Sequence, residues 1–437
     1  MSRPVLRIQG DFLRFLLGRA HGTLAIQMQA VAVHWLVYAL TKDALYLGLI
    51  GLVEATPALV VALYAGHFAD HHSRRRIVMA CLMLLAGSSL FLALVWHWQA
   101  PDSVLLIILF IIIFLTGFAR GFFAPAAFGL MSQILERPQY SRGAAWNSSV
   151  WHIAWIVGAL AGGWMMRFFK TEYVFVIVAG GLLVALASFY FIQDRGLPAD
   201  QKKSTVVQDI RTGMQFLWQS PLILGAMSLD LFAVLFGGVA AMLPVFASDV
   251  FDRGPDALGI LRSAVPAGAF LMSVFLTRKP PERFIGPRML FAVSGFGLFT
   301  LLFALTPLVV QSIGHANIVQ TVLPGYAHWQ DTLVFWTAIT MLIASGAMDG
   351  YSVVVRSTLI QSLVPDRLRG KVAAINAVFI GSSNEIGAFE SGLAAKILGL
   401  VPSIVFGTSI TQISVLGVAI SVPQFRRLDR IDAGSEA

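Results

Sequence analysis

Residues 104–130 read VLLIILFIIIFLTGFARGFFAPAAFGL, an apolar stretch that contains one charged residue, Arg120. A helix of about 20 apolar residues spans the roughly 30 Å hydrocarbon core of a bilayer. Because lipid offers no hydrogen-bond partners to the backbone, such a stretch must pair its own amide groups. This segment therefore predicts a transmembrane helix.

Eleven further stretches along the chain have the same character. Hydropathy, turn residues and charges place the expected spans near 12–40, 46–66, 76–97, 104–130, 145–167, 173–192, 221–247, 257–277, 287–310, 333–357, 373–395 and 402–422. The composition agrees, because 57% of the residues are hydrophobic and only 12% are charged, against about 25% charged in soluble domains. We therefore expect an all-α membrane protein with twelve transmembrane helices.

The basic residues predict the orientation of these spans. If the N-terminus is cytoplasmic, 21 of the lysines and arginines near the spans lie inside and five lie outside, namely Lys42, Arg167, Lys170, Arg253 and Lys396. An excess of this kind marks cytoplasmic loops. Both termini should therefore be cytoplasmic, in the inner (plasma) membrane of a bacterial cell. The net charge of +8 is then explained by contact with membrane lipids, and we expect no nucleic-acid binding.

The two halves of the chain echo one another at a constant offset of 229 residues. Gly117, Arg120, Gly121, Asn147, Gly158 and Gly163 recur as Gly346, Asp349, Gly350, Asn376, Gly387 and Gly392. Repeats of this kind pack around a central site in transporters. We therefore expect two pseudo-symmetric six-helix bundles at 1–192 and 221–422, a cytoplasmic linker at 193–220 and a cytoplasmic tail at 423–437.

The linker contains a helical pattern of its own. Val206, Ile210, Met214 and Leu217 recur at helical spacing. The pattern predicts an amphipathic helix that lies on the inner membrane surface.

Nine of the charged residues inside the expected spans are candidates for a functional role. A charge near a helix centre costs about 2.5–3.5 kcal/mol on insertion scales, so such residues should be paired or functional. They are Arg19, Glu54, Arg120, Asp230, Arg262, Asp349, Arg356, Glu385 and Glu390. Five acids against four cations leave one carboxylate over, and a desolvated carboxylate can carry a proton. We expect Glu54 and Asp230 to be the proton carriers, and we expect Asp349 to pair with Arg120, its counterpart in the repeat.

A polar stripe runs along the first span. Arg19, Thr23, Gln27 and His34 lie at helical spacing, so they share one face. We expect this face to line a transport cavity. Hydrogen bonding to neighbouring helices is the alternative for Thr23 and Gln27.

The loop after the second span carries a compact motif. Gly66 and Asp70 precede a basic run of Arg74, Arg75 and Arg76. Here the chain resembles the major facilitator superfamily, whose loop-two signature has a glycine, an acid four residues later and then a basic run. The resemblance implies that these five residues form an inner gate. A plain cytoplasmic loop is the alternative for the arginines, and we expect no metal site at the neighbouring histidines.

Two further stretches resemble antiporter signatures of that superfamily. Arg120 is followed by Ala124, Ala126 and Ala127, and the glycine-rich run of the fifth span contains Gly158, Gly162 and Gly163. The run has Ala159 where the signature has proline. Small residues also permit close packing of two helices, which is the alternative reading of the run.

Segments of the second half, among them 228–232 and 365–370, resemble the enterobactin-exporter-like, drug-antiporter branch of the superfamily. The resemblance implies a secondary-active exporter that works by alternating access. Its substrate would be an amphipathic siderophore or drug, exchanged for protons in an efflux cycle that confers drug resistance. The alternatives are a lysophospholipid flippase on the same fold, an uptake carrier, and a transport-dead sensor or assembly partner. The sequence has no phosphate-cradling loop and no nucleophile elbow, so we expect no enzyme activity and no cofactor. We also expect the protein to be a monomer.

Overall fold

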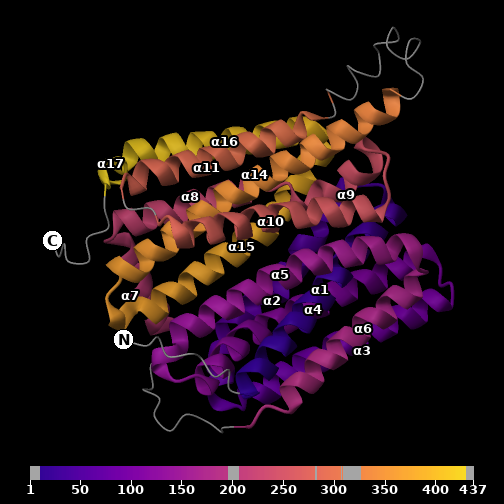
Figure 1. The fold of residues 1–437 in the computed structure, drawn as a ribbon, viewed down its shortest axis with the longest axis horizontal. Helices are drawn as coiled ribbons and strands as arrows, with labels where there is room; N and C mark the ends of the chain where they lie inside the picture. Colours follow the sequence, from indigo (N-terminus) through magenta and orange to yellow (C-terminus); the bar gives the residue numbers. More distant parts are fainter. Residues whose placement is uncertain (1–9, 195–205, 281–282, 307, 309–325, 430–437) are drawn as a thin grey trace. The chain divides into compact units, whose positions relative to one another are not determined.

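The computed structural model describes residues 10–194, 206–280, 283–306, 308 and 326–429, and the regular elements in these ranges are helical (Figure 1). The first helices are α1 (Gly10–Thr41), α2 (Ala44–His71), α3 (Arg74–His97), α4 (Asp102–Ile134), η1 (Arg137–Gln139), α5 (Tyr140–Phe168) and α6 (Thr171–Tyr190). Those that follow are α7 (Val206–Trp218), α8 (Pro221–Gly237), η2 (Ala240–Met242), α9 (Leu243–Val245), η3 (Phe246–Val250), α10 (Pro255–Arg278), α11 (Ile285–Ala304), α14 (Tyr326–Leu363), α15 (Asp366–Leu398), α16 (Leu400–Ser421) and α17 (Pro423–Arg427). Within the described residues, 12 helical segments are long and apolar enough to cross a membrane. The prediction of a twelve-span all-α protein is confirmed.

Local sequence signals set several helix ends. Ser73 precedes α3, and its hydroxyl accepts the backbone N–H of Arg76 at 3.5 Å, as an N-cap serine does. Pro221 and Pro255 open α8 and α10, where a helix needs no partner for the missing N–H. The α1–α2 connection is short because Lys42 turns the chain with a left-handed backbone, φ 49°.

The span expected at 221–247 is not one continuous helix. After α8 ends at Gly237, the chain continues through the short elements η2, α9 and η3, the last of which is a π-helical turn. Two adjacent glycines and the following Pro244 disfavour an unbroken helix here. The hydroxyl of Ser391 on α15 donates to the Gly238 carbonyl at 3.0 Å. This bond satisfies a backbone group that the break would leave unpaired in an apolar medium.

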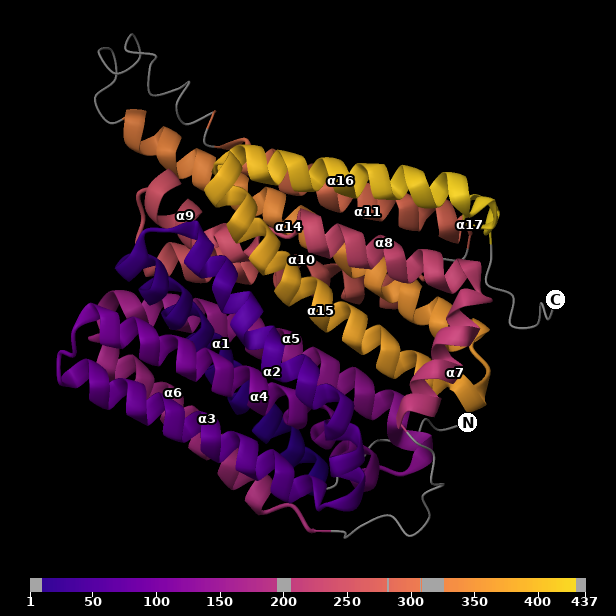
Figure 2. The same cartoon turned by 180° about the vertical axis from the view of Figure 1, so that it is seen from behind.

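Contacts divide the chain into two compact units, and each is described here by itself. Unit 1 comprises Met1–Leu36 and Val53–Lys203. Its helices α3 and α6 pack along one another, as Figure 1 and Figure 2 both show. Phe15 and Phe189 meet edge to face inside its core, with ring centroids 5.8 Å apart.

Unit 2 comprises Val37–Leu52 and Ser204–Ala437. It therefore includes the end of α1 and the first turns of α2. Helix α16 packs along α8 and α11, and α10 packs along α14 (Figure 2). Leu229, Met289 and Val355 are buried in the core between these helices.

Glycines at corresponding positions of the repeat make corresponding contacts. A β-carbon placed on Gly121 of α4 would lie 3.2 Å from a carbonyl oxygen of α2, and one placed on Gly350 of α14 would lie 2.9 Å from a carbonyl oxygen of α10. Likewise, Gly158 of α5 approaches the backbone of α1, and Gly387 of α15 approaches the backbone of α8. The offset of 229 residues thus relates two helix pairs in unit 1 to two helix pairs in unit 2.

Helix α7 forms where the linker pattern predicted a helix, and the C-terminal part of its apolar face packs on protein. Leu217 is fully buried, and Met214 packs beside it against residues of α8, α14 and α15. Gly213 permits this approach, because a β-carbon there would lie 2.7 Å from Cδ1 of Ile375. Met214 and Leu217 are therefore buried against protein, while Ile210 and Trp218 stay exposed. The expected position of α7 on the membrane surface stays a prediction.

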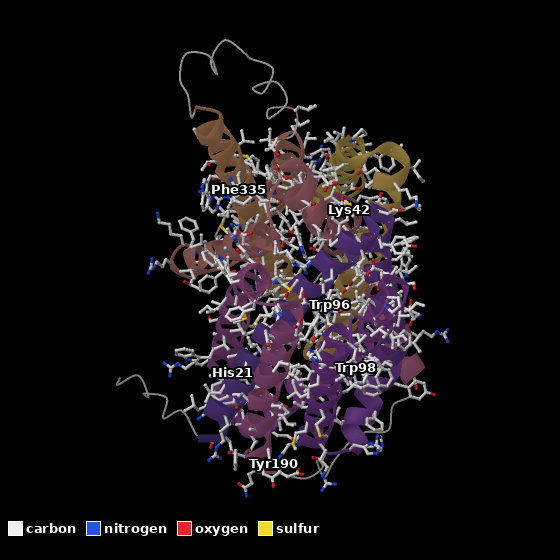
Figure 3. All side chains as sticks on the ribbon, turned by 90° about the vertical axis from the view of Figure 1, so that its right-hand side faces the viewer. His21, Lys42, Trp96, Trp98, Tyr190 and Phe335 are labelled. Carbon is white, nitrogen blue, oxygen red and sulfur yellow. The ribbon has the colours of Figure 1, made fainter. Side chains whose placement is uncertain are left out.

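The outside of the helices carries many apolar side chains. In unit 1, Trp98, which directly follows α3, and Tyr190, the last residue of α6, are 68% and 58% exposed, and both are labelled in Figure 3. Exposed aromatic and aliphatic side chains are unusual at this density on a water-soluble protein. They are expected on the lipid-facing surface of transmembrane helices.

Candidate functional site

Unit 1 contains an ion pair between two of its spans. The guanidinium of Arg120 on α4 contacts the carboxylate of Glu54 on α2. Gly117, one turn before Arg120, lets the two helices approach closely, since a β-carbon placed there would overlap the Glu54 carbonyl oxygen and would lie 3.0 Å from Cγ of Pro57. The Arg120 side chain is 49% exposed and that of Glu54 is 15% exposed. This pair is therefore partly accessible from outside the unit.

Unit 2 contains a second ion pair, which is buried. The guanidinium of Arg356 on α14 contacts the carboxylate of Asp230 on α8, and the two side chains are 3% and 8% exposed. Charges at such depth are tolerated when they neutralise one another. Both acids expected to carry protons, Glu54 and Asp230, are thus occupied by arginines in this structure.

The remaining charged residues of unit 2 differ in their surroundings. The carboxylate of Asp349, on α14, forms no hydrogen bond or ion pair within the described residues. Glu390 on α15 has the hydroxyl of Ser391 beside it. Arg262 on α10 and Glu385 on α15 are partly buried. Among these residues, Asp349 best fits the surplus carboxylate that the sequence predicts. Its expected pairing with Arg120 stays a prediction, because it would join the two units.

The polar stripe of α1 does not form a single network in unit 1. The Arg19 guanidinium lies 5.5 Å from the ring centroid of Phe123. His34 uses Nδ1 for a 2.7 Å bond to the Ala30 carbonyl within its own helix. The side-chain carbonyl of Gln27 is buried without a hydrogen-bond partner among the described residues. Gln27 is therefore the member of the stripe that is best prepared to bind an additional donor.

Two glutamines that the sequence analysis passed over link helices inside the units. The hydroxyl of Ser89 on α3 donates to Gln29 on α1 at 2.6 Å. In unit 2, the hydroxyl of Ser294 on α11 donates to Gln412 on α16, also at 2.6 Å. Polar side chains in apolar spans commonly join helices in this way. A glutamine inside an apolar span is visible in the sequence, but the partner of each glutamine is set by the packing of the helices.

The basic run of the predicted gate motif is anchored in unit 1. Arg74 donates to the Gly129 carbonyl in the last two turns of α4 at 3.0 Å. Arg75 donates to the carbonyls of Phe189, at 3.2 Å, and Tyr190 at the end of α6. These helix ends carry partial negative charge, which attracts cations.

The rest of the motif is described in part. Arg76 lies 3.9 Å from Asp194, whose carboxylate also accepts the Ser73 hydroxyl. Gly66 and Asp70 belong to the helical backbone of α2, while their side-chain environment lies outside what the structure describes. In the described part of the chain no cluster of potential metal ligands is found.

Gly158, Gly162 and Gly163 lie on the buried side of α5. A β-carbon on Gly158 would lie 2.6 Å from the Leu24 carbonyl oxygen, and one on Gly162 would lie 2.8 Å from Cα of Met28. Close packing of α5 on α1 therefore accounts for Gly158 and Gly162 by itself.

A set of polar contacts in unit 2, which the sequence analysis did not anticipate, surrounds the α1–α2 connection. The hydroxyl of Tyr38 donates to the Asp249 carboxylate, and Lys42 donates to the Ser248 hydroxyl at 3.2 Å. Lys396 of α15 donates to Asp43 at 2.6 Å. No local pattern marks these residues as partners, because they are separated by roughly half of the chain or more.

The Asp43–Lys396 pair should make stability depend on pH at the acid end. The hydrogen bond from Lys396, and a second from the Leu45 backbone N–H, hold the pKa of Asp43 below its ordinary value of 3.8. A carboxyl group whose pKa is lower in the folded state than in the unfolded state stabilises the fold at pH values above its ordinary pKa. This contribution is lost as the pH falls through the lowered pKa of the folded state. Asp43→Asn should therefore lower the unfolding temperature at neutral pH only, with convergence on the parent protein in acid. A difference that persisted unchanged at acid pH would contradict the assignment. Glu172→Gln serves as the control.

A chain with twelve spans, a repeat, and charges paired inside each unit has the features of a polytopic transporter. The sequence profile of the Major Facilitator Superfamily matches residues 15–388. The chain therefore belongs to the Major Facilitator Superfamily, a family of transporters rather than enzymes.

Curated relatives include efflux pumps. The multidrug efflux pump Tap of Mycolicibacterium fortuitum is 23% identical over 91% of this chain and 92% of its own length. Macrolide efflux protein A of Streptococcus pyogenes is 20% identical over 59% of this chain and 64% of its own length. The second match thus spans somewhat less than two thirds of that relative.

Solved structures share the fold at low identity. A bacterial homologue of the human lysosomal transporter Spinster aligns with a TM-score of 0.64 and 15% identity, over 95% of this chain and 96% of that one. The peptide transporter POT aligns with a TM-score of 0.68 and 12% identity, over 98% and 97%. These likenesses concern the fold alone.

Proposed function

We propose that this protein is a secondary-active exporter that exchanges an amphipathic small molecule for protons by alternating access. Membership of the superfamily supports transport, and the efflux pumps among its relatives support the outward direction and a drug-like or siderophore-like substrate. The excess of basic residues in the expected inner loops supports cytoplasmic termini in a bacterial inner membrane.

The observation that carries the proton-coupled part is the contrast between the acids of unit 2. Asp230 is neutralised by Arg356, whereas Asp349 has no ionic partner within the described residues. A carboxylate in an ion pair resists protonation, while an unpaired one inside a span is stabilised by taking up a proton. Asp349 is therefore the best candidate for the coupling site, ahead of Glu54 and Asp230.

The energy available to such a site is sufficient. One charge that moves down a 100 mV potential releases about 2.3 kcal/mol. This corresponds to a roughly 50-fold concentration ratio for each proton exchanged.

Asp349→Asn should uncouple transport from the proton gradient. We expect efflux driven by an imposed pH gradient to fall about 5- to 150-fold, the range of a typical coupling free energy between two sites. Exchange down the substrate gradient should persist. Proteoliposomes loaded with dyes, macrolides, siderophores or lysolipids provide the measurement. Asp102→Asn, which removes an exposed carboxylate at the start of α4, is the matched control.

The outcomes separate the rival functions. Flux of the parent protein that ignores the proton gradient would remove the antiport proposal, and a response to lysolipids alone would favour a flippase. Uptake together with protons would indicate a symporter. Full coupling in Asp349→Asn would move the proton site to another acid, such as Glu390.

A further inference from the structure

Unit 2 contains a side pocket of about 390 Å³ among α10, α11 and α14. Its walls are mainly apolar, with Met272, Phe275 and Leu276 from α10, Phe291 from α11 and Met348 from α14. Phe275 and Phe291 are 52% and 72% exposed. Both lie on helices long and apolar enough to cross the membrane. The open side of the pocket therefore offers an apolar surface to hydrocarbon.

Two cations line the same pocket at one end. Lys279 directly follows the last residue of α10, and Arg288 lies in the first turn of α11. Both side chains are exposed, and within the described residues neither forms an ion pair. Nearby Arg283 differs, because it lies 3.7 Å from Asp429. Among the described residues, the two helix ends thus place positive charge that has no ionic partner beside an apolar pocket.

A buried hydroxyl completes the wall. Tyr351 lines the pocket, and its buried hydroxyl forms no hydrogen bond within the described residues. Arg288 lines the same pocket. A buried polar group without a partner costs free energy. An anionic oxygen of a ligand beside the exposed Arg288 would neutralise this cation.

We propose that this pocket binds an anionic phospholipid. Its phosphate would lie between Lys279 and Arg288, and one acyl chain would pack on Phe275, Phe291 and Met348. Apolar side chains at membrane depth match an acyl chain, and basic residues at the adjacent helix ends match an anionic head group. With cytoplasmic termini, these helix ends lie at the inner leaflet.

The lipid pocket is separate from the candidate coupling charges. Asp349, the proposed coupling residue, lies between Met348 and Tyr351 on α14 but does not line the pocket. At 3.6 residues per turn it lies roughly 100° and 160° around the helix from those two residues. Lipid binding here therefore does not depend on the proposed antiport, and each can fail without the other.

Native mass spectrometry of the detergent-purified full chain tests the proposal with phosphatidylglycerol as the probe. Each basic residue near an anionic lipid lowers the dissociation constant for that lipid by about 5-fold. The double variant Lys279→Gln/Arg288→Gln should therefore bind phosphatidylglycerol about 25-fold more weakly. Arg426→Gln/Arg427→Gln, which removes the same charge from exposed positions on α17, should bind like the parent protein. Phosphatidylcholine should bind weakly to all three.

A second variant tests the pocket without altering charge. Met272→Trp fills the cavity and should also reduce phosphatidylglycerol retention, whereas Tyr351→Phe should reduce it less. The proposal would be overturned if the parent protein and Lys279→Gln/Arg288→Gln bound phosphatidylglycerol equally well. It would also be overturned if Arg426→Gln/Arg427→Gln lost as much phosphatidylglycerol binding as Lys279→Gln/Arg288→Gln. Unchanged binding in Met272→Trp would exclude the acyl-chain pocket. Displacement of the lipid by millimolar inorganic phosphate would show an anion site instead.

Discussion

Arg356→Gln is expected to lower the free energy of unfolding by about 3–5 kcal/mol. The substitution leaves the carboxylate of Asp230 buried, with its side chain 8% exposed and no cation to neutralise it. An uncompensated charge in a medium of low dielectric constant costs more than the loss of an interaction on the surface. Equilibrium unfolding in detergent micelles, followed by tryptophan fluorescence and circular dichroism, provides the measurement.

The double variant Asp230→Asn/Arg356→Gln separates this explanation from loss of packing. It removes both charges, so most of the stability should return, because neutral side chains of similar size can hydrogen-bond in the same place. Arg211→Gln, at an exposed position on α7, should change little. If the double variant were as unstable as Arg356→Gln, the buried charge would not be the cause.

Gly268→Leu is expected to destabilise unit 2 by about 3 kcal/mol or more. A β-carbon at this position of α10 would overlap the carbonyl oxygen of Ile343 on α14 and would lie 2.8 Å from the backbone nitrogen of Ala347. Backbone atoms of a transmembrane helix cannot move aside as a flexible side chain can. The two helices would have to separate, and they form the most extensive helix pair of the unit.

Gly417→Leu on α16 provides the matched control, because nothing lies within 4 Å of a β-carbon there and the residue is exposed. We expect its stability to be unchanged or raised by up to about 1 kcal/mol, since glycine is a poor helix former. The unfolding temperature and the fraction of monodisperse protein after extraction are the measurements. Equal behaviour of the two variants would argue against tight packing of α10 on α14.

Much of the fold could be predicted because its signals are local. Each span must satisfy its own backbone in lipid, so hydropathy located all twelve. The exception is informative. The pattern at 221–247 has the hydropathy of one helix, but the glycine pair at Gly237 and Gly238 ends α8, and Ser391 from a distant helix satisfies a carbonyl at the break. Hydropathy reports how favourably a segment partitions into lipid, and it does not report a hydrogen-bond donor that comes from a distant helix.

The candidate site could be predicted only as a set of residues. The cost of a charge in a span identified Asp230, Arg356, Glu54, Arg120 and Asp349 as residues that need partners. The partners themselves depend on which helix faces meet. Asp230 and Arg356 are on α8 and α14, and their contact requires the packing of unit 2. The same packing leaves Asp349 without an ionic partner among the described residues and makes it the stronger candidate for proton coupling.

The sequence by itself determined the number of spans, the internal repeat and the identity of the charges inside the membrane. The spans and the charges can be read locally, because hydrocarbon penalises both an unpaired backbone group and a charged side chain. The repeat can be read from matching residues at one constant offset. Only the tertiary structure decided which charges neutralise each other, where the seventh span breaks, that α7 packs on protein, and that α10, α11 and α14 leave a pocket. Apart from the glycine pair that ends α8, those outcomes arise from contacts between residues far apart in the chain, and no local pattern specifies them.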